Sequence, residues 1–195
     1  MLTACRNSKG ISRGRSQITN MVNMSSMKSL YTRSDDNISA KLLRECLDVL
    51  AESLTHIFNQ SLMTGIFPDE WKSARVTPLY KNSGTRSDPT NYRPISVIPV
   101  VAKVFERIIY DQLYHYLIKN NFFSCHQSGF RSLHSTLTAL IEATDSWAMD
   151  IDRGLVTAVV FLDLKKAFDT VDHDSLLRKL HYYGICWTSH KWFAS

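Results

Sequence analysis

An apolar run that ends in an aspartate constrains this chain most strongly. Residues Leu155–Leu162 are rich in valine, leucine and phenylalanine and have the length of one strand, which predicts a buried β-strand. Asp163 follows directly, and Asp169 and Asp172 come within the next nine residues. A carboxylate at the carboxyl end of a buried strand is well placed to hold a divalent cation, because Mg²⁺ prefers oxygen ligands. On spacing alone, an aspartate that caps the following helix explains the pattern equally well.

The residues around Asp163 carry a more specific signal. The sequence FLDLKKAFDTVDH (161–173) closely resembles the first catalytic palm motif of reverse transcriptases from non-LTR retrotransposons of the LINE-like, Jockey type. Three further segments agree with this family in order and spacing: FPDEWKSARVTPLYKNSG (67–84), NYRPISVIPVVAKVFERII (91–109) and HQSGFRSLHSTLTAL (126–140). The resemblance covers roughly residues 38–184, which is most of the chain.

The resemblance implies an α/β (α+β) fold, namely the fingers subdomain and the first part of the palm of a right-hand polymerase. Within a partial reverse transcriptase domain over 35–195, we expect the fingers at about 38–153 and the start of the palm at about 154–195. Residues 1–34 contain six lysines and arginines and no acid. A mitochondrial transit peptide has this composition, but a disordered basic leader or a start within a longer reading frame explains it better.

Apolar periodicity and turn residues predict the order helix, two strands, two helices, strand, helix. Ser135 is expected to cap the third helix, which would bury a stripe of apolar residues. Gly65 is expected to end the first helix, and Pro99 to open the second. The expected helices span 39–64, 99 to about 116, 135–151 and 174–183, and the expected strands span 74–80, 92–98 and 155–162.

Resemblance to the family assigns Asp163 as the first metal-binding carboxylate, with the backbone carbonyl of Leu164 as a further ligand. Enzymes with two-metal chemistry use one Mg²⁺ to activate the primer 3′-oxygen and a second to hold the triphosphate, and we expect Mn²⁺ to substitute. Phe168 matches an aromatic position under the incoming sugar, where a flat ring favours deoxynucleotides by excluding a 2′-hydroxyl; core packing is its alternative role. Asp169 and Asp172 are expected to cap or bond the backbone near the next helix.

Lys81 and Arg93 occupy the positions of two basic residues that resemble the finger-strand pair that grips the incoming triphosphate in retroviral enzymes. A compact ammonium and a forked guanidinium suit that task, although solvated surface cations explain the residues as well. The segment 72–131 holds nine bases against three acids, which favours contact with phosphates there. The overall net charge of +5 is weaker evidence, since the leader supplies it.

The QSGFR motif (127–131) is expected to contact the template or a phosphate through Gln127 and Arg131, with Gly129 allowing a tight turn. An intraprotein partner for Arg131 is a competing interpretation. Lys165 is expected to be solvated or to touch the nucleic-acid backbone.

Cysteine usage and hydropathy exclude several other classes of protein. The four cysteines lie far apart without a CxxC motif, which indicates a reduced intracellular protein of the cytoplasm or nucleus. The longest uncharged apolar stretch, Pro94–Ala102, contains two prolines and is too short to cross a bilayer. His181, Cys186 and His190 have spacings that a zinc site can use, but we interpret them as scattered structural residues.

The combined prediction is part of an RNA-directed DNA polymerase, a nucleotidyltransferase that takes an RNA template, a DNA primer and dNTPs. The family's Tyr-x-Asp-Asp hairpin is not found after Asp163, and the polar Asp35-Asp36 pair cannot replace it. We therefore expect residues 1–195 alone to be inactive and to self-associate through an exposed palm edge. The alternatives are a decayed or domesticated fragment that at most binds nucleic acid weakly and, more remotely, a helical interaction module.

Overall fold

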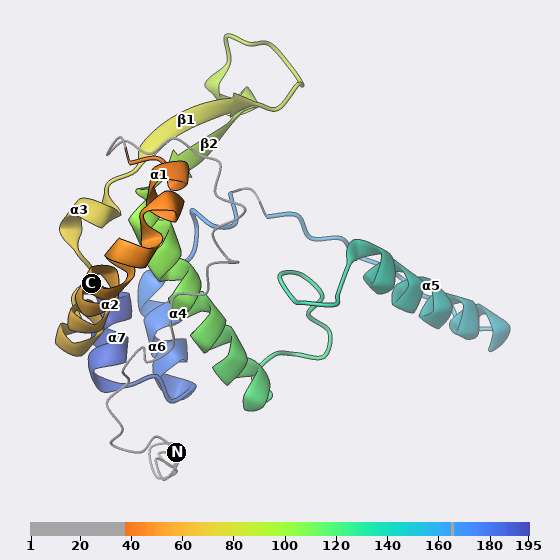
Figure 1. Cartoon of the computed structure of the whole chain (residues 1–195). Coiled ribbons are helices and arrows are strands. Elements are labelled where there is room, and N and C mark those ends of the chain that lie inside the picture. The colour runs from red at the N-terminus through yellow and green to blue at the C-terminus, as the bar shows by residue number, and fades with distance from the viewer. Residues whose placement is uncertain (1–37, 165) are drawn as a thin grey trace. The chain divides into compact units, whose positions relative to one another are not determined.

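The computed structural model describes residues 38–164 and 166–195. Helices and one small antiparallel sheet make up the described chain (Figure 1), which confirms the predicted mixed α/β class. The described residues divide into two compact units: residues 38–115 with 174–195, and residues 116–164 with 166–173. The predicted leader and the Asp35-Asp36 pair lie outside the described residues.

The predicted helix over 39–64 is two helices, α1 (Ala40–Glu45) and α2 (Leu47–Thr64). Ser39 caps the N-terminus of α1, because its hydroxyl accepts the Leu42 N–H at 3.1 Å. Gly65 ends α2 in the left-handed conformation at φ 67°, as predicted. A Cβ at Gly65 would also lie 2.9 Å from the carbonyl oxygen of Thr188, so glycine allows both the turn and this close approach.

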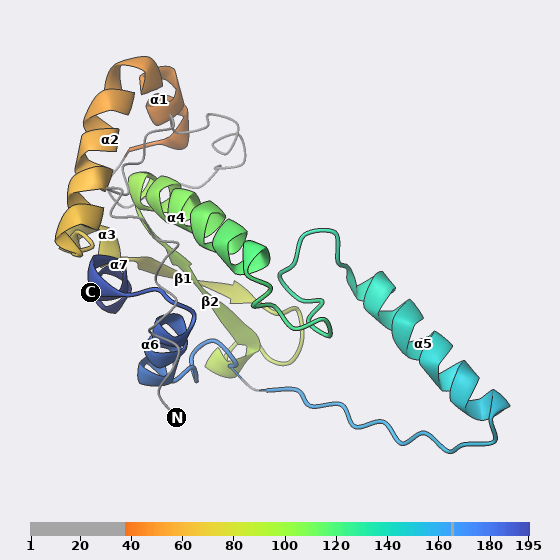
Figure 2. The same cartoon turned by 90° about the horizontal axis from the view of Figure 1, so that it is seen from below.

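Strands β1 (Arg75–Tyr80) and β2 (Tyr92–Val97) pair antiparallel, at the predicted places, into a two-stranded ribbon that is visible in Figure 2. Pro78 lies directly opposite Pro94. Proline has no N–H to give to a ladder, so this pair fits only where the N–H positions of both strands point outward. Each outer edge of the ribbon therefore lacks a central hydrogen-bond donor.

Aromatic rings form the core of the first unit, where α2, α3 (Asp69–Lys72), α4 (Val100–Lys119) and α7 (Trp187–Ala194) supply them. The rings of Phe58 and Phe105 are fully buried and stack at 4.4 Å with an interplanar angle of 1°. The core cluster also includes Phe67, Trp71 and Trp192, each within 6.0 Å of the Phe105 ring.

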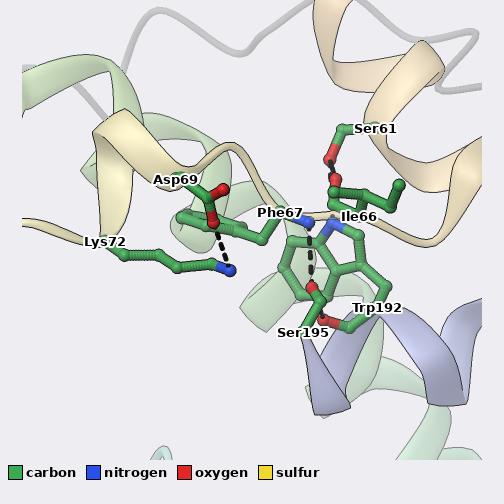
Figure 3. Close-up of polar contacts among 7 residues, drawn as sticks. All are labelled: Ser61, Ile66, Phe67, Asp69, Lys72, Trp192 and Ser195. Atoms are coloured by element: carbon green, nitrogen blue, oxygen red, sulfur yellow. Dashed lines mark hydrogen bonds and ion pairs between the residues drawn. The ribbon is translucent and has the colours of Figure 1, made fainter.

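Hydrogen bonds fix α7 against the last turn of α2 and the segment that follows it (Figure 3). The indole N–H of Trp192 donates to the Ser61 hydroxyl at 3.0 Å, and that hydroxyl donates to the Ile66 carbonyl at 2.6 Å. The Phe67 N–H donates to the Ser195 hydroxyl at 2.9 Å. Sequence patterns missed both α7 and α3, because such short helices carry too few turns for a periodic signal. The predicted last helix is confirmed as α6 (His173–Tyr182).

In the second unit, α5 (Thr136–Asp152) begins at Ser135, as predicted, with a reciprocal capping box to Thr138. The expected buried stripe on this helix is wrong, since no residue of α5 is buried. Leu137 is 65% exposed and Ile141 is 49% exposed. An apolar stripe indicates which face of a helix can be covered, but covering it requires a partner element, and none described in this unit packs on it.

The predicted strand Leu155–Leu162 is also wrong as a strand, because the segment is irregular and exposed. Val156 is 97% exposed and Phe161 is 84% exposed. A strand needs a neighbour for its backbone hydrogen bonds, and the only two strands in the described chain pair with each other. The Thr157 hydroxyl instead donates to the Asp150 carboxylate at 2.9 Å.

None of the helices within residues 38–164 and 166–195 is long and apolar enough to cross a membrane.

We predict that Trp192→Ala lowers the free energy of unfolding of the first unit by about 3–5 kcal/mol, because it removes a large buried ring and the hydrogen bond that its indole N–H donates to Ser61. Urea unfolding followed by circular dichroism measures the change. Trp187→Ala is the matched control, since Trp187 is 91% exposed, and it should change stability by less than about 0.5 kcal/mol. Equal losses in both variants would contradict the core described above.

We predict that residues 1–195 self-associate through the exposed apolar segment 155–162. Val160→Lys together with Phe161→Lys should lower the average mass seen in sedimentation velocity. Both side chains are largely exposed, at 79% and 84%, so their replacement leaves no cavity. A chain that is monomeric before substitution would refute the prediction.

Candidate active site

The β1–β2 hairpin brings the two predicted triphosphate-binding residues together. Arg93 lies in β2 opposite Leu79, and the Lys81 N–H donates to the Asn91 carbonyl at 2.8 Å, which extends the same pairing beyond Tyr80. Partners across a ladder share a face, and so do residues two apart along a strand. Lys81 and Arg93 therefore lie on one face of the hairpin, and both are solvent-exposed.

The Lys81 side chain is not a free surface cation. Its ammonium donates to the Thr90 carbonyl at 2.7 Å, within the 3₁₀ turn η3 (Pro89–Asn91). The Asp88 carboxylate accepts the Thr90 N–H at 2.8 Å and so begins this turn. Hydrogen bonds from the Thr90 backbone and hydroxyl, followed by the charge of Lys81, hold the pKa of Asp88 below its ordinary value.

Two tyrosines tie the rest of the hairpin loop to its strands. The Tyr80 hydroxyl donates to the Gly84 carbonyl at 2.6 Å, and the Tyr92 hydroxyl donates to the Arg86 carbonyl at 2.8 Å. The two rings lie 5.4 Å apart, and the Arg86 guanidinium lies 5.4 Å from the Tyr80 ring. The loop is thus ordered beside the two cations, at the end of the hairpin away from α2 and α7 in Figure 1.

Asp163 and Leu164 lie in the irregular segment before α6, and both are exposed. Throughout residues 38–164 and 166–195, no three histidines, cysteines or acids are grouped closely enough to hold a metal ion. Asp163 is therefore not part of a complete metal site within the described residues. Lys165 falls outside the described residues. Asp172 directly precedes α6, where a capping residue is expected.

Phe168 packs on another motif rather than in a core. Its ring is 76% exposed and meets the ring of Phe130 edge to face, with centroids 5.9 Å apart and an interplanar angle of 82°. Phe130 belongs to the QSGFR motif, is 83% exposed and has φ 59°. The contact joins two motifs that lie far apart in the sequence. Because the Phe168 ring is largely exposed, core packing is not its role in the described chain.

Arg131 has partners within the protein, as its competing interpretation expected. Its guanidinium donates to the carbonyls of Ser124 and Gln127 at 3.0 and 3.2 Å and lies over the Phe123 ring at 5.6 Å. The Gln127 amide donates to the Gly129 carbonyl at 3.3 Å. Gly129 lies in a turn, as expected, but its φ is not positive and an added Cβ would meet nothing within 4 Å, so the turn does not require a glycine at this position.

The His181, Cys186 and His190 side chains come together instead of lying scattered as expected. The Cys186 Sγ lies 3.6 Å from His181 Nδ1, and the two histidine rings are 5.8 Å apart. The His190 Nε2 lies 2.9 Å from the Leu177 carbonyl oxygen, a contact that occupies this nitrogen within the fold. These contacts support the structural interpretation of the cluster.

Sequence reasoning missed the residues that order the hairpin loop, above all Asp88 and Asn91. A usable signal was present, since an aspartate directly before a proline is a common start for a helical turn. The ties made by Tyr80 and Tyr92 had no such local signal.

A family model described as reverse transcriptase (RNA-dependent DNA polymerase) matches residues 80–194, more than half of the chain. The match includes Lys81 and Arg93 on the hairpin as well as Asp163 and Phe168.

Curated relatives agree with this match. The chain is 33% identical over 138 residues to the "Probable RNA-directed DNA polymerase from transposon BS" of Drosophila melanogaster, which covers 68% of the chain and 15% of the relative. It is 32% identical over 145 residues to the RNA-directed DNA polymerase from mobile element jockey of the same species, covering 74% of the chain and 16% of the relative. A Pol polyprotein from the type-1 retrotransposable element R2 of Popillia japonica is 29% identical over 124 residues, which cover 64% of the chain and 17% of the relative. The chain thus spans about a sixth of the length of these relatives.

Proposed function

Because this chain belongs to the reverse transcriptase (RNA-dependent DNA polymerase) family, we propose that it supplies the nucleotide-gripping hairpin and the first palm carboxylate of a non-LTR retrotransposon polymerase. In the proposed reaction, the primer 3′-oxygen attacks the α-phosphorus of a dNTP opposite an RNA template, and pyrophosphate leaves. The observation that carries the proposal is the hairpin register, which sets Lys81 and Arg93 on one face.

Lys81 and Arg93 are proposed to bind the triphosphate of the incoming nucleotide. An ammonium attracts phosphate as a point charge, while a guanidinium can make two parallel hydrogen bonds to phosphate oxygens. One N–H of Lys81 is used by the Thr90 carbonyl, and two remain for the ligand. The pair would neutralise charge on the bound triphosphate and so strengthen binding of the incoming nucleotide.

Asp163, with the Leu164 carbonyl, is proposed to contribute to a site for Mg²⁺, or Mn²⁺ in its place. Reverse transcriptases use divalent metal ions, and when bound the metal would stabilise negative charge on the reacting phosphate. The described residues do not by themselves fit such an ion, because Asp163 has no cluster of further acidic, histidine or cysteine ligands there. Asp163 is accordingly given the role of one ligand, which needs carboxylates from additional polymerase sequence.

Phe168 is proposed to lie under the sugar of the incoming nucleotide. Its exposed ring supports this role, because a buried ring could not meet a ligand. A flat apolar surface in that position would collide with a ribose 2′-hydroxyl and would leave that hydroxyl without a hydrogen bond.

RNA template and DNA primer are the proposed partners of the basic 72–131 segment, with Gln127, Arg131 and Lys165 as further contacts. The division into fingers (38–153) and early palm (154–195), after a basic leader (1–34), belongs to the same proposal. So does an intracellular setting, in the cytoplasm or nucleus, which is supported by Cys46, Cys125 and Cys186 being thiols rather than disulfides.

We predict that residues 1–195 joined to the downstream polymerase sequence of the jockey relative extend a DNA primer on an RNA template. Asp163→Asn should then lower the extension rate more than about a hundredfold, because the charge that holds the metal is lost. Phe168→Ala should mainly raise ribonucleotide incorporation. A gel-based extension assay with dNTPs and rNTPs measures both effects.

Asp145→Asn is the matched control for that experiment, since Asp145 is an exposed acid on α5. This variant should extend the primer at the unsubstituted rate. Full activity of the Asp163→Asn protein would overturn the metal assignment. Extension by residues 1–195 alone would overturn the expectation that Asp163 needs further carboxylates.

We predict weak, sequence-independent binding of nucleic acid, with a Kd no tighter than about 1 μM at physiological salt and a steep loss as salt rises. Fluorescence anisotropy with a labelled RNA–DNA duplex measures it. Deleting residues 1–34 should leave part of the binding, because the 72–131 segment keeps its nine bases. If all binding disappears with the leader, the hairpin loses its role as a nucleic-acid surface.

A further inference from the structure

The loop between β1 and β2 contains a chain of contacts that leads to Lys81. The Asp88 carboxylate accepts the Thr90 N–H at 2.8 Å, and the Thr90 carbonyl accepts the Lys81 ammonium at 2.7 Å. Asp88 therefore fixes the residue whose carbonyl holds the Lys81 side chain. Neither the family match nor the motifs assign Asp88 any function.

We propose that Asp88 is a positioning residue that, through Thr90, holds the Lys81 ammonium ready for the triphosphate of an incoming nucleotide. This inference rests on the proposed function and deepens the role of Lys81. A lysine side chain loses rotamer freedom when it grips a phosphate, and a lysine already held by a carbonyl loses less on binding. Asp88 thus strengthens nucleotide binding without contact with the nucleotide.

Direct contact of Asp88 with the triphosphate is unfavourable, because both are anions. The hydrogen bonds from Thr90 keep the pKa of Asp88 low, so the carboxylate stays charged at neutral pH. Its negative charge also favours an ammonium nearby. The side chain accordingly acts on the turn and on Lys81.

Other contacts hold the remainder of the loop independently of Asp88. The Asn91 amide donates to the Thr85 carbonyl at 2.8 Å, and the Tyr80 hydroxyl donates to the Gly84 carbonyl. Gly84 has φ 77°, and a Cβ there would lie 2.5 Å from the Asn91 amide nitrogen. Substitution of Asp88 should therefore free the 3₁₀ turn and Lys81 while the hairpin stays folded.

The first test measures the reactivity of Lys81 in the complete chain. Residues 1–195 are treated briefly with acetic anhydride, and acetylation of each lysine is quantified by mass spectrometry. Asp88→Ala should raise Lys81 acetylation about threefold, as expected for the loss of one modest hydrogen bond. Asp88→Asn should restore much of the protection, because the amide oxygen still accepts the Thr90 N–H.

Asp69→Ala is the matched control, since the Asp69 carboxylate holds the Lys72 ammonium at 2.8 Å in a similar exposed contact. It should raise acetylation of Lys72 and leave Lys81 unchanged. Millimolar inorganic tripolyphosphate, used as the probe, should protect Lys81 better in the unsubstituted chain than in Asp88→Ala. Equal Lys81 reactivity in the unsubstituted chain and Asp88→Ala would overturn the inference.

The second test uses the chain joined to the jockey polymerase sequence, with primer extension as the readout. Asp88→Ala should raise the KM for dNTP about three- to tenfold with little change in kcat, because the contact affects nucleotide binding rather than the transition state alone. In a Lys81→Ala background, Asp88→Ala should have no further effect.

The double-variant cycle distinguishes the proposed triphosphate role of Lys81 from the proposed positioning role of Asp88. If Lys81→Ala leaves the KM unchanged, the proposed triphosphate role of Lys81 fails and the inference fails with it. If Lys81→Ala raises the KM but Asp88→Ala adds its effect independently, the triphosphate role stands and the positioning role of Asp88 is refuted.

Discussion

The stacked pair Phe58–Phe105 is the contact on which the first unit depends. It joins α2 to α4 across a long sequence separation, and Trp192 closes the cluster from α7. Close packing of rings in both stacked and edge-on geometry stabilises such a cluster beyond the area it buries. Because β1 follows α3 and β2 leads into α4, the same cluster anchors both ends of the hairpin that carries Lys81 and Arg93. The proposed grip on the nucleotide thus depends on rings that never touch it.

Features governed by local rules were predictable from the sequence. The hairpin strands, the serine caps of α1 and α5 and the glycine end of α2 follow from side chains acting on their own backbone neighbours. The family motif likewise marked Lys81 and Arg93, and the strand register, extended by the hydrogen bond from the Lys81 N–H to the Asn91 carbonyl, then indicates that they share a face. Apolar periodicity did not predict burial correctly where a second helix or strand is needed to cover the apolar face. The apolar stripe of α5 and the apolar run before Asp163 show which side chains of those segments could be buried. No element of the described chain packs on them, so they stay exposed.

The candidate site shows the same division. Asp88 carries a local capping signal beside Pro89, so its hydrogen bond to Thr90 was within reach of sequence reasoning. The edge-to-face contact of Phe130 with Phe168 was not, since it joins residues from separate motifs with no pairing rule between them. The positive φ at Phe130, with no steric need for glycine at position 129, likewise reflects how the whole loop is tied by Arg131 and Gln127.

The facing prolines of the hairpin limit how it can meet a partner. The outer backbone N–H and C=O groups of a two-stranded ribbon can normally pair with an additional extended chain. Pro78 and Pro94 remove a hydrogen-bond donor from the middle of each outer edge. Growth of the sheet by an added strand is therefore disfavoured, and a ligand has to be recognised through side chains. The proposed nucleic-acid ligand is not affected by this, because it has no peptide groups that could pair with a strand edge. The prolines therefore disfavour protein partners that bind by adding a strand, while the proposed nucleotide ligand does not depend on those backbone groups.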